Sequence, residues 1–138
     1  IAGANGTTHD VRPADVGSRL TFAVTGTATG RPTVTKVSAP TDVVDPGLQS
    51  QRLRPTVTGK PRVGGTVRAV VPPRDEGTTT TYQWYAGRKA LRRGTSPTLA
   101  LRNKQRGTRL RVLVTTTKPG YRDVVKISTA TKKVKRRR

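Results

Sequence analysis

The chain has 138 residues, enough for one domain or slightly more, and apolar residues make up only 31% of it. It has no Cys, which excludes disulfides and thiolate metal sites, and it has no apolar run long enough for a transmembrane helix. The formal net charge is +21, but residues 1–47 carry four basic and four acidic groups, whereas residues 48–138 carry 24 basic and three acidic groups. The excess positive charge therefore belongs to the second part of the chain.

An internal repeat organises the chain. The stretch DVGSRLTFAVT, which begins at Asp15, matches QRGTRLRVLVT, which begins at Gln105, at an offset of 90 residues. The match runs without gaps from Ile1 to Val44, and about a third of the 44 pairs are identical. Self-similarity at a fixed offset indicates repeated modules. The predicted organisation is half of a module at 1–46, a linker at 47–52, a complete module at 53–134 and a basic tail at 135–138.

The complete module divides into short stretches with strand-like, period-2 alternation of apolar side chains. Strands at this spacing predict an antiparallel β-sandwich, and no helix-length periodicity of 3.6 residues is present. Alternation places Trp84 on the inward face with Tyr82, so we expect Trp84 to fill the core. It also places Val125 and Ile127 inward, with Lys126 opposite. The predicted strands are 54–59, 66–71, 80–87, 96–101, 109–116 and 123–129.

Basic side chains surround one aromatic residue on the predicted outward face. Tyr85 is expected to lie beside the side chains of Arg109, Arg111 and Lys126, where an aromatic ring could stack on a sugar or base while Arg binds an acidic group. A basic hairpin and the terminal run KKVKRRR extend the charge, and such a run is expected to be flexible. The alternative is a solvated charged face with a solubilising end. The candidate polyanion-binding residues are Tyr85, Arg88, Lys89, Arg92, Arg93, Arg109, Arg111, Lys126, Lys132, Lys133, Lys135, Arg136, Arg137 and Arg138.

Patterns typical of catalysis are not found. The single histidine, His9, precedes Asp10, so in a strand the two side chains point to opposite faces. There is no Gly-x-Ser-x-Gly turn, and the seven acidic residues are scattered. The Gly pair at 64–65 lacks the Lys and the helix of a phosphate-binding loop. We therefore expect no enzymatic activity, no cofactor and no metal site.

The run PRVGGTVRA…TYQWYAGRKALRRGTSPTLAL…RGTRLRVLVTTTKPGYRDV resembles the immunoglobulin-like repeats that occur in tandem in secreted and wall-attached proteins of high-GC Gram-positive bacteria. The shared elements are a VG-x-x-L strand, a Y-x-W strand, an A-D-x-G-x-x-L-x-V-x-V segment and a K-x-G-Y turn. Two positions depart from the pattern. Gln105 replaces the acid seen at Asp15, which is expected to weaken a loop contact, and Arg31 replaces the aromatic seen at Tyr121, which is expected to loosen the last turn of the first module.

The resemblance implies an immunoglobulin-like sandwich that is secreted or held at a bacterial cell surface, with further domains upstream. It implies a non-enzymatic surface or spacer module whose basic terminal repeat contacts an anionic wall polymer such as teichoic acid. The alternatives are a nucleic-acid-binding module and a bare spacer. The half-module should expose an apolar face that includes Val11, Leu20, Phe22 and Val24, and its open edge should leave it disordered, strained or dimeric.

Overall fold

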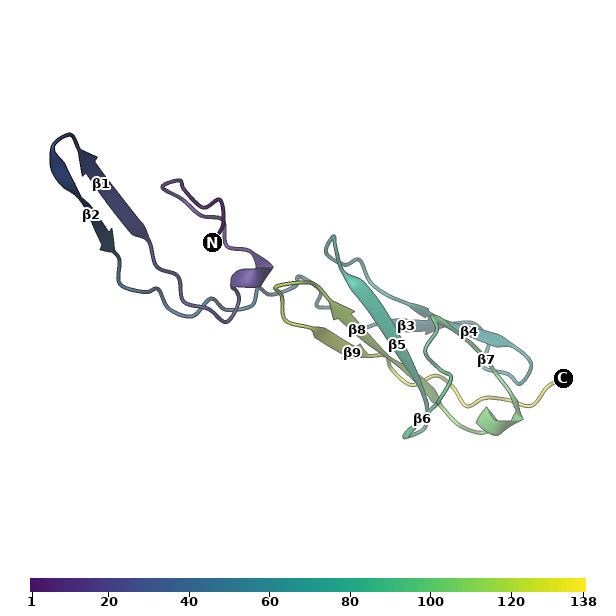
Figure 1. The fold of residues 1–138 in the computed structure, drawn as a ribbon. Helices are drawn as coiled ribbons and strands as arrows, with labels where there is room; N and C mark the ends of the chain where they lie inside the picture. Colours follow the sequence, from purple (N-terminus) through teal and green to yellow (C-terminus); the bar gives the residue numbers. More distant parts are fainter. The chain divides into compact units, whose positions relative to one another are not determined.

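A computed structural model describes residues 1–138 (Figure 1). It contains nine strands and no α-helix, with single 3₁₀ turns at Pro13–Asp15 (η1) and Asn103–Gln105 (η2). Every strand pairing is antiparallel, so the predicted all-β class is confirmed at this level. The structure has no helix with the length and hydropathy needed to cross a bilayer. The chain forms two compact units, Ile1–Gly47 with Pro119–Tyr121, and Leu48–Lys118 with Arg122–Arg138.

The second unit, called here the complete module, contains two antiparallel sheets. One has three strands in the order β3-β4-β7 and the other has four in the order β6-β5-β8-β9. Gln49 and Gln51, which the sequence analysis placed in a linker, are buried in this unit, where the Gln49 amide donates to the carbonyl oxygen of Thr116 at 2.9 Å. The strands are β3 (Thr56–Thr58), β4 (Thr66–Val70), β5 (Thr79–Ala86), β6 (Lys89–Ala90), β7 (Thr98–Ala100), β8 (Leu110–Thr117) and β9 (Val124–Ile127).

One apolar core joins the two sheets of the complete module. Val67 of β4 belongs to the same buried cluster as Trp84 of β5 and Val114 of β8. Trp84 is fully buried, as predicted, and its indole Nε1 donates to the carbonyl oxygen of Ser96 at 2.8 Å. Two antiparallel sheets that share one core are consistent with a β-sandwich.

The first unit, called here the half-module, contains one two-stranded sheet of β1 (Ala23–Ala28) and β2 (Arg31–Val37). Every residue of both strands is exposed. Phe22 and Val24 keep 49% and 55% of their surface exposed, which confirms the predicted apolar face, although Leu20 is half-buried. The β1–β2 turn is formed despite Arg31, which pairs directly with Ala28.

The loop before each repeated strand keeps the same hydrogen bond in both modules. In the half-module the backbone N–H of Arg12 donates to Asp15 Oδ2 at 2.9 Å. In the complete module the N–H of Arg102 donates to Gln105 Oε1, also at 2.9 Å. Gln105 therefore keeps this bond with a neutral amide oxygen in place of the carboxylate, and the expectation that the exchange weakens the contact stays a prediction.

Hydroxyl groups repeat in the same way. In each module a Ser and a Thr hydroxyl accept backbone N–H groups from the neighbouring strand segment, so that part of the strand pairing runs through side chains. All four bonds fall at positions related by 90 residues, which extends the repeat from the sequence to the structure. They join Leu20 N to Thr41 Oγ1 (3.0 Å), Phe22 N to Ser38 Oγ (2.9 Å), Leu110 N to Thr131 Oγ1 (3.0 Å) and Val112 N to Ser128 Oγ (3.0 Å).

The predicted orientation of β9 is wrong. Lys126 lies opposite the buried Val114, whereas Ile127 lies opposite Leu113. Directly opposed residues point to the same side of a sheet, so Lys126 is on the core side and Ile127 on the outer side. The cause is Ser128, which is buried while its hydroxyl accepts the N–H of Val112 and so fixes which residues of β9 face inward. The half-buried Lys126 can lay its apolar stem along the core edge with its ammonium in water.

Candidate polyanion-binding site

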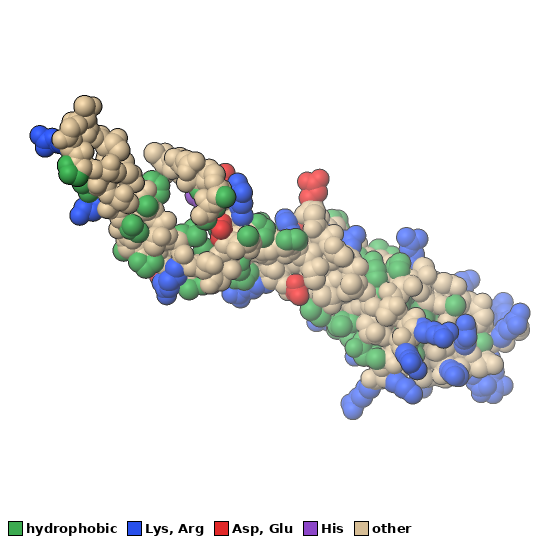
Figure 2. Space-filling view, viewed as in Figure 1, with side chains coloured by type: hydrophobic (Ala, Val, Ile, Leu, Met, Phe, Trp, Pro, Cys, Tyr) green, Lys and Arg blue, Asp and Glu red, His purple; other side chains and the backbone are tan.

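Basic side chains gather at one end of the complete module. Figure 2 shows Lys and Arg (blue) crowded over the part that carries β6 and the carboxyl terminus, with acidic side chains (red) away from it. The β5–β6 hairpin supplies part of this charge, because its basic residues are all exposed. They are Arg88 at the turn, Lys89 in β6, and Arg92 and Arg93 after β6.

Tyr85 and Arg111 form a pair on the outer face of the four-stranded sheet. Tyr85 lies directly opposite Arg111 on β8 and Ala90 on β6, so the three side chains point to the same side. Tyr85 is half-buried and Arg111 is exposed. Lys126, which was expected beside them, belongs to the other face. The outer face therefore offers one aromatic ring and one adjacent guanidinium.

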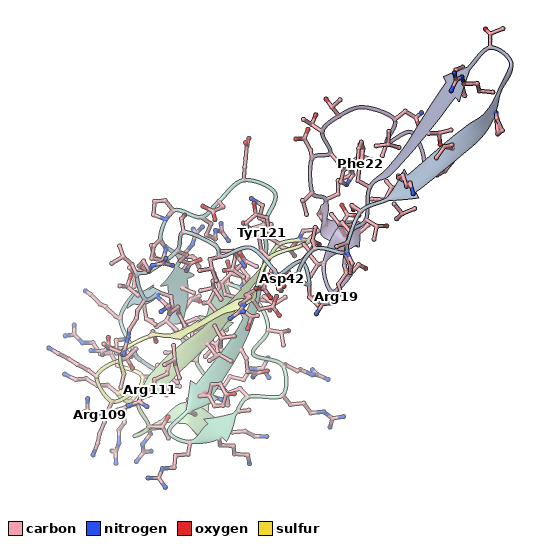
Figure 3. The ribbon with its side chains drawn as sticks, turned by 90° about the vertical axis from the view of Figure 1, so that its left-hand side faces the viewer. Arg19, Phe22, Asp42, Arg109, Arg111 and Tyr121 are labelled. Atoms are coloured by element: carbon pink, nitrogen blue, oxygen red, sulfur yellow. The ribbon has the colours of Figure 1, made fainter.

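A hydrogen bond to a backbone carbonyl orients the guanidinium of Arg109. Its Nη1 donates to the carbonyl oxygen of Thr131 at 3.1 Å. Figure 3 shows Arg109 and Arg111 projecting close together from the complete module. A guanidinium has five N–H donors, so one bond to a carbonyl orients the group and leaves donors for an anion.

The half-module has the same arginine with a different neighbour. Arg19, the counterpart of Arg109, donates to the carbonyl oxygen of Thr41 at 2.9 Å, and its Nη1 also lies 3.9 Å from Asp42 Oδ1. The counterpart of Asp42 in the complete module is Lys132. The threonine that accepts this bond is thus followed by an acidic residue in one module and by a lysine in the other.

Two further positions carry a basic residue in the complete module but not in the half-module. Asp45 is replaced by Lys135, and Val43 by Lys133. These replacements leave the repeated hydrogen bonds in place, so the complete module is a positively charged version of the same framework.

The terminal run is held in place through Lys135, so the expectation that all of it is flexible is wrong. Val134 is buried in the core, where its N–H donates to Thr108 O at 2.8 Å and its carbonyl oxygen accepts the N–H of Gly107 at 2.9 Å. Lys135 pairs on the other side, donating to Pro61 O at 2.9 Å and accepting from Val63 N at 3.0 Å. One apolar side chain and two sets of backbone bonds anchor the segment. Only the last three residues, Arg136, Arg137 and Arg138, which are exposed, lie beyond these bonds.

One basic residue near this terminal segment was missed by the sequence analysis. Arg62 forms an isolated parallel bridge with Lys135 and is half-buried. No local pattern could have indicated it, because the two residues are far apart in sequence. We call Arg62, Arg109, Lys132, Lys133 and Lys135 the terminal basic cluster.

The single histidine makes a structural contact. His9 Nε2 lies 2.9 Å from Asp15 Oδ2, which also accepts the backbone N–H of Arg12. The bond from Arg12, and next to it the contact with His9, lower the pKa of Asp15 below its ordinary value of 3.8. The contact joins the amino-terminal segment to the loop at η1. No third His, Asp or Glu joins them in a cluster that could hold a metal ion.

No protein-family model matches the chain, and neither the curated proteins nor the solved structures contain a significant match.

Proposed function

We propose that the chain is a non-enzymatic, immunoglobulin-like surface module of a tandem array, and that its complete module binds an anionic polymer of the bacterial cell wall, such as teichoic acid. The observation that carries the proposal is the change of charge on a repeated framework. Arg109 and Arg19 make the same bond to the carbonyl oxygen of a threonine, but the residue after that threonine is Asp42 in one module and Lys132 in the other. A spacer would need no such change.

The terminal basic cluster suits a polymer with repeated negative charges. Its lysines lie on a segment that is anchored by Val134, so they are held at the surface without the loss of chain entropy that a free tail would suffer on binding. Each neutralised phosphate releases condensed counterions, which makes binding strong at low salt and weak at high salt. The exposed hairpin at Arg88 and Lys89 extends the surface.

A second candidate is single-stranded nucleic acid, which the pairing of Tyr85 with Arg111 favours. Bases stack on exposed aromatic rings with about 1–3 kcal/mol each, and a neighbouring guanidinium can bind the phosphate. Only one aromatic ring is present on this face, and it is half-buried. The wall polymer therefore remains the first choice.

The test measures binding of the full chain to labelled teichoic acid and to labelled single-stranded DNA across a salt series. The variant Lys132→Asp/Lys135→Asp gives the complete module the residues found at Asp42 and Asp45, and it leaves the backbone bonds in place. For DNA, the slope of log affinity against log salt should fall by about 1.4, because each single-strand phosphate contact contributes about 0.7. The matched control, Arg54→Asp/Arg68→Asp, removes the same charge near β3 and on β4.

Four results separate the hypotheses. Loss of binding in the lysine variant but not in the control supports a site at the terminal basic cluster. Equal loss in both variants means that the ligand responds only to net charge. If Tyr85→Ala weakens DNA binding and leaves teichoic acid binding unchanged, the nucleic-acid function is favoured. If neither polymer binds at physiological salt, the spacer function is left.

A further inference from the structure

The half-module exposes side chains whose counterparts are the core of the complete module. Phe22 and Val24 are 49% and 55% exposed, whereas their counterparts Val112 and Val114 are fully buried. Figure 3 shows Phe22 in the half-module beside the start of β1. We call Val11, Leu20, Phe22 and Val24 the apolar face.

The complete module shows what covers such a face. Val112 and Val114 lie in one cluster with Trp84 of β5 and Val67 of β4. Both of these covering side chains come from residues before position 91. Residues 1–47 contain no counterparts of Val67 and Trp84, since the offset pairs Ile1 with Leu91.

The backbone edges of the half-module are also unpaired where the complete module is paired. In the complete module β5 pairs with β8 from Thr79/Thr117 to Ala86/Leu110. The counterpart of that β8 edge is residues 20–27, and β1 pairs only with β2. Residues 8–10, the counterpart of β7, form no strand, whereas β7 pairs with β4. Unpaired strand edges are templates for further strands.

A cavity of about 570 Å³ marks the same place. It lies between the amino-terminal segment and the start of β1, and its lining includes Leu20, Phe22 and Thr25. The hydroxyls of Ser38 and Thr41 also border it. Its position corresponds to that of β5 beside β8 in the complete module, because Ile1 and Ala4 of its lining are the counterparts of Leu91 and Gly94, which bond to the backbone of Trp84.

We propose that the apolar face docks a polypeptide segment with the chemistry of residues 53–90, which is the segment that covers the equivalent face of the complete module. Such a segment supplies strands of alternating apolar residues and one indole. The offset sets the register, because Ile1 is the counterpart of Leu91, so that a segment equivalent to 53–90 fused in front of Ile1 reaches the face without a connector. A second copy is a poorer occupant, since its own residues 53–90 already cover its Val112 and Val114. The inference is independent of polyanion binding.

The experiment adds a copy of residues 48–90 in front of Ile1 of the full chain. Phe22 is the only Phe, so fluorophenylalanine gives one ¹⁹F resonance that reports on the apolar face. The added segment should shift this resonance and slow amide exchange in residues 20–27 by at least about 100-fold, as expected for a covered strand. The control carries Val67→Asp and Trp84→Asp in the added copy, which should leave exchange fast.

A second variant allows for a poor fit. Phe22→Val places in the half-module the side chain found at Val112, against which a copy of residues 53–90 already packs. Exchange that stays fast at residues 20–27 in the extended chain, both with Phe22 retained and with Phe22→Val, overturns the proposal. Protection of these residues in the unextended chain that rises with protein concentration, together with dimers in sedimentation equilibrium, identifies a second copy as the occupant and also overturns it.

Discussion

Val24 and Val114 are the same residue type at equivalent positions with opposite exposure. Val114 is fully buried on β8, and Val24 is 55% exposed on β1. Substitution by Ala removes two carbons, which are worth about 0.8 kcal/mol each when buried. With a cavity contribution added, we expect Val114→Ala to lower the free energy of unfolding by about 2–3 kcal/mol. Val24→Ala should cost well under about 1 kcal/mol, because most of its surface stays in water and no cavity forms.

Urea unfolding followed by the fluorescence of Trp84 measures the cost of Val114→Ala. Trp84 is the only Trp and lies in the core of the complete module, so its signal reports on that module alone. For a urea dependence of about 1–2 kcal/mol/M, Val114→Ala should lower the midpoint by about 1–3 M. For Val24→Ala the readout is amide exchange in residues 20–27, which reports on the half-module and should change by less than about fivefold. A cost for Val24→Ala as large as that for Val114→Ala would refute the reasoning that burial, rather than the repeated pattern, sets the cost.

Two further predictions concern hydrogen bonds. Ser128→Ala removes the acceptor of the buried Val112 N–H and should lower the free energy of unfolding in urea by about 1–3 kcal/mol. Ser38→Ala, at the exposed counterpart, should lower it by less than about 0.5 kcal/mol. A larger cost for Ser38→Ala would contradict this reasoning. The pKa of Asp15 is lowered, so its stabilising contacts are complete above pH 3.8 and are lost as the pH falls through the lowered folded-state pKa. The amide signal of Arg12 in an NMR titration should therefore move with a midpoint below 3.8, and a midpoint at or above that value would count against the Asp15 contact.

The strands and the core could be predicted from the sequence because both depend on local alternation. The period-2 pattern around Trp84 placed its side chain on the inward face. A large apolar ring on that face is expected to fill the core, and Trp84 is fully buried there. The offset of 90 residues carried this interpretation to the half-module, where it correctly gave exposed side chains at Phe22 and Val24.

Which residues of β9 face the core could not be predicted in this way. Val125 and Ile127 are more apolar than Lys126, so alternation favoured the wrong face. The orientation depends on the hydroxyl of Ser128, which accepts a backbone N–H from Val112 on another strand. A polar side chain that replaces a backbone partner leaves no apolar signal.

The composition of the terminal run also gave no indication that residues 132–135 are held in place. Six charges surround Val134, and the average of such a stretch indicates a flexible tail. One apolar side chain in the core and the backbone bonds to Pro61 and Thr108 determine the outcome instead. The bridge between Arg62 and Lys135 joins distant segments, and so the position of Arg62 beside Lys135 could be found only from the structure.

The repeated hydroxyl and backbone bonds have a consequence for how such modules can evolve. Thr41 and Thr131 hold their strands in the same way, yet the next residue is an acid in one module and a base in the other. Folding therefore places almost no constraint on the sign of the charge at this surface. Duplication of one module, followed by a few substitutions next to the fixed hydroxyls, is enough to change the sign of the charge at equivalent surface positions on the same framework.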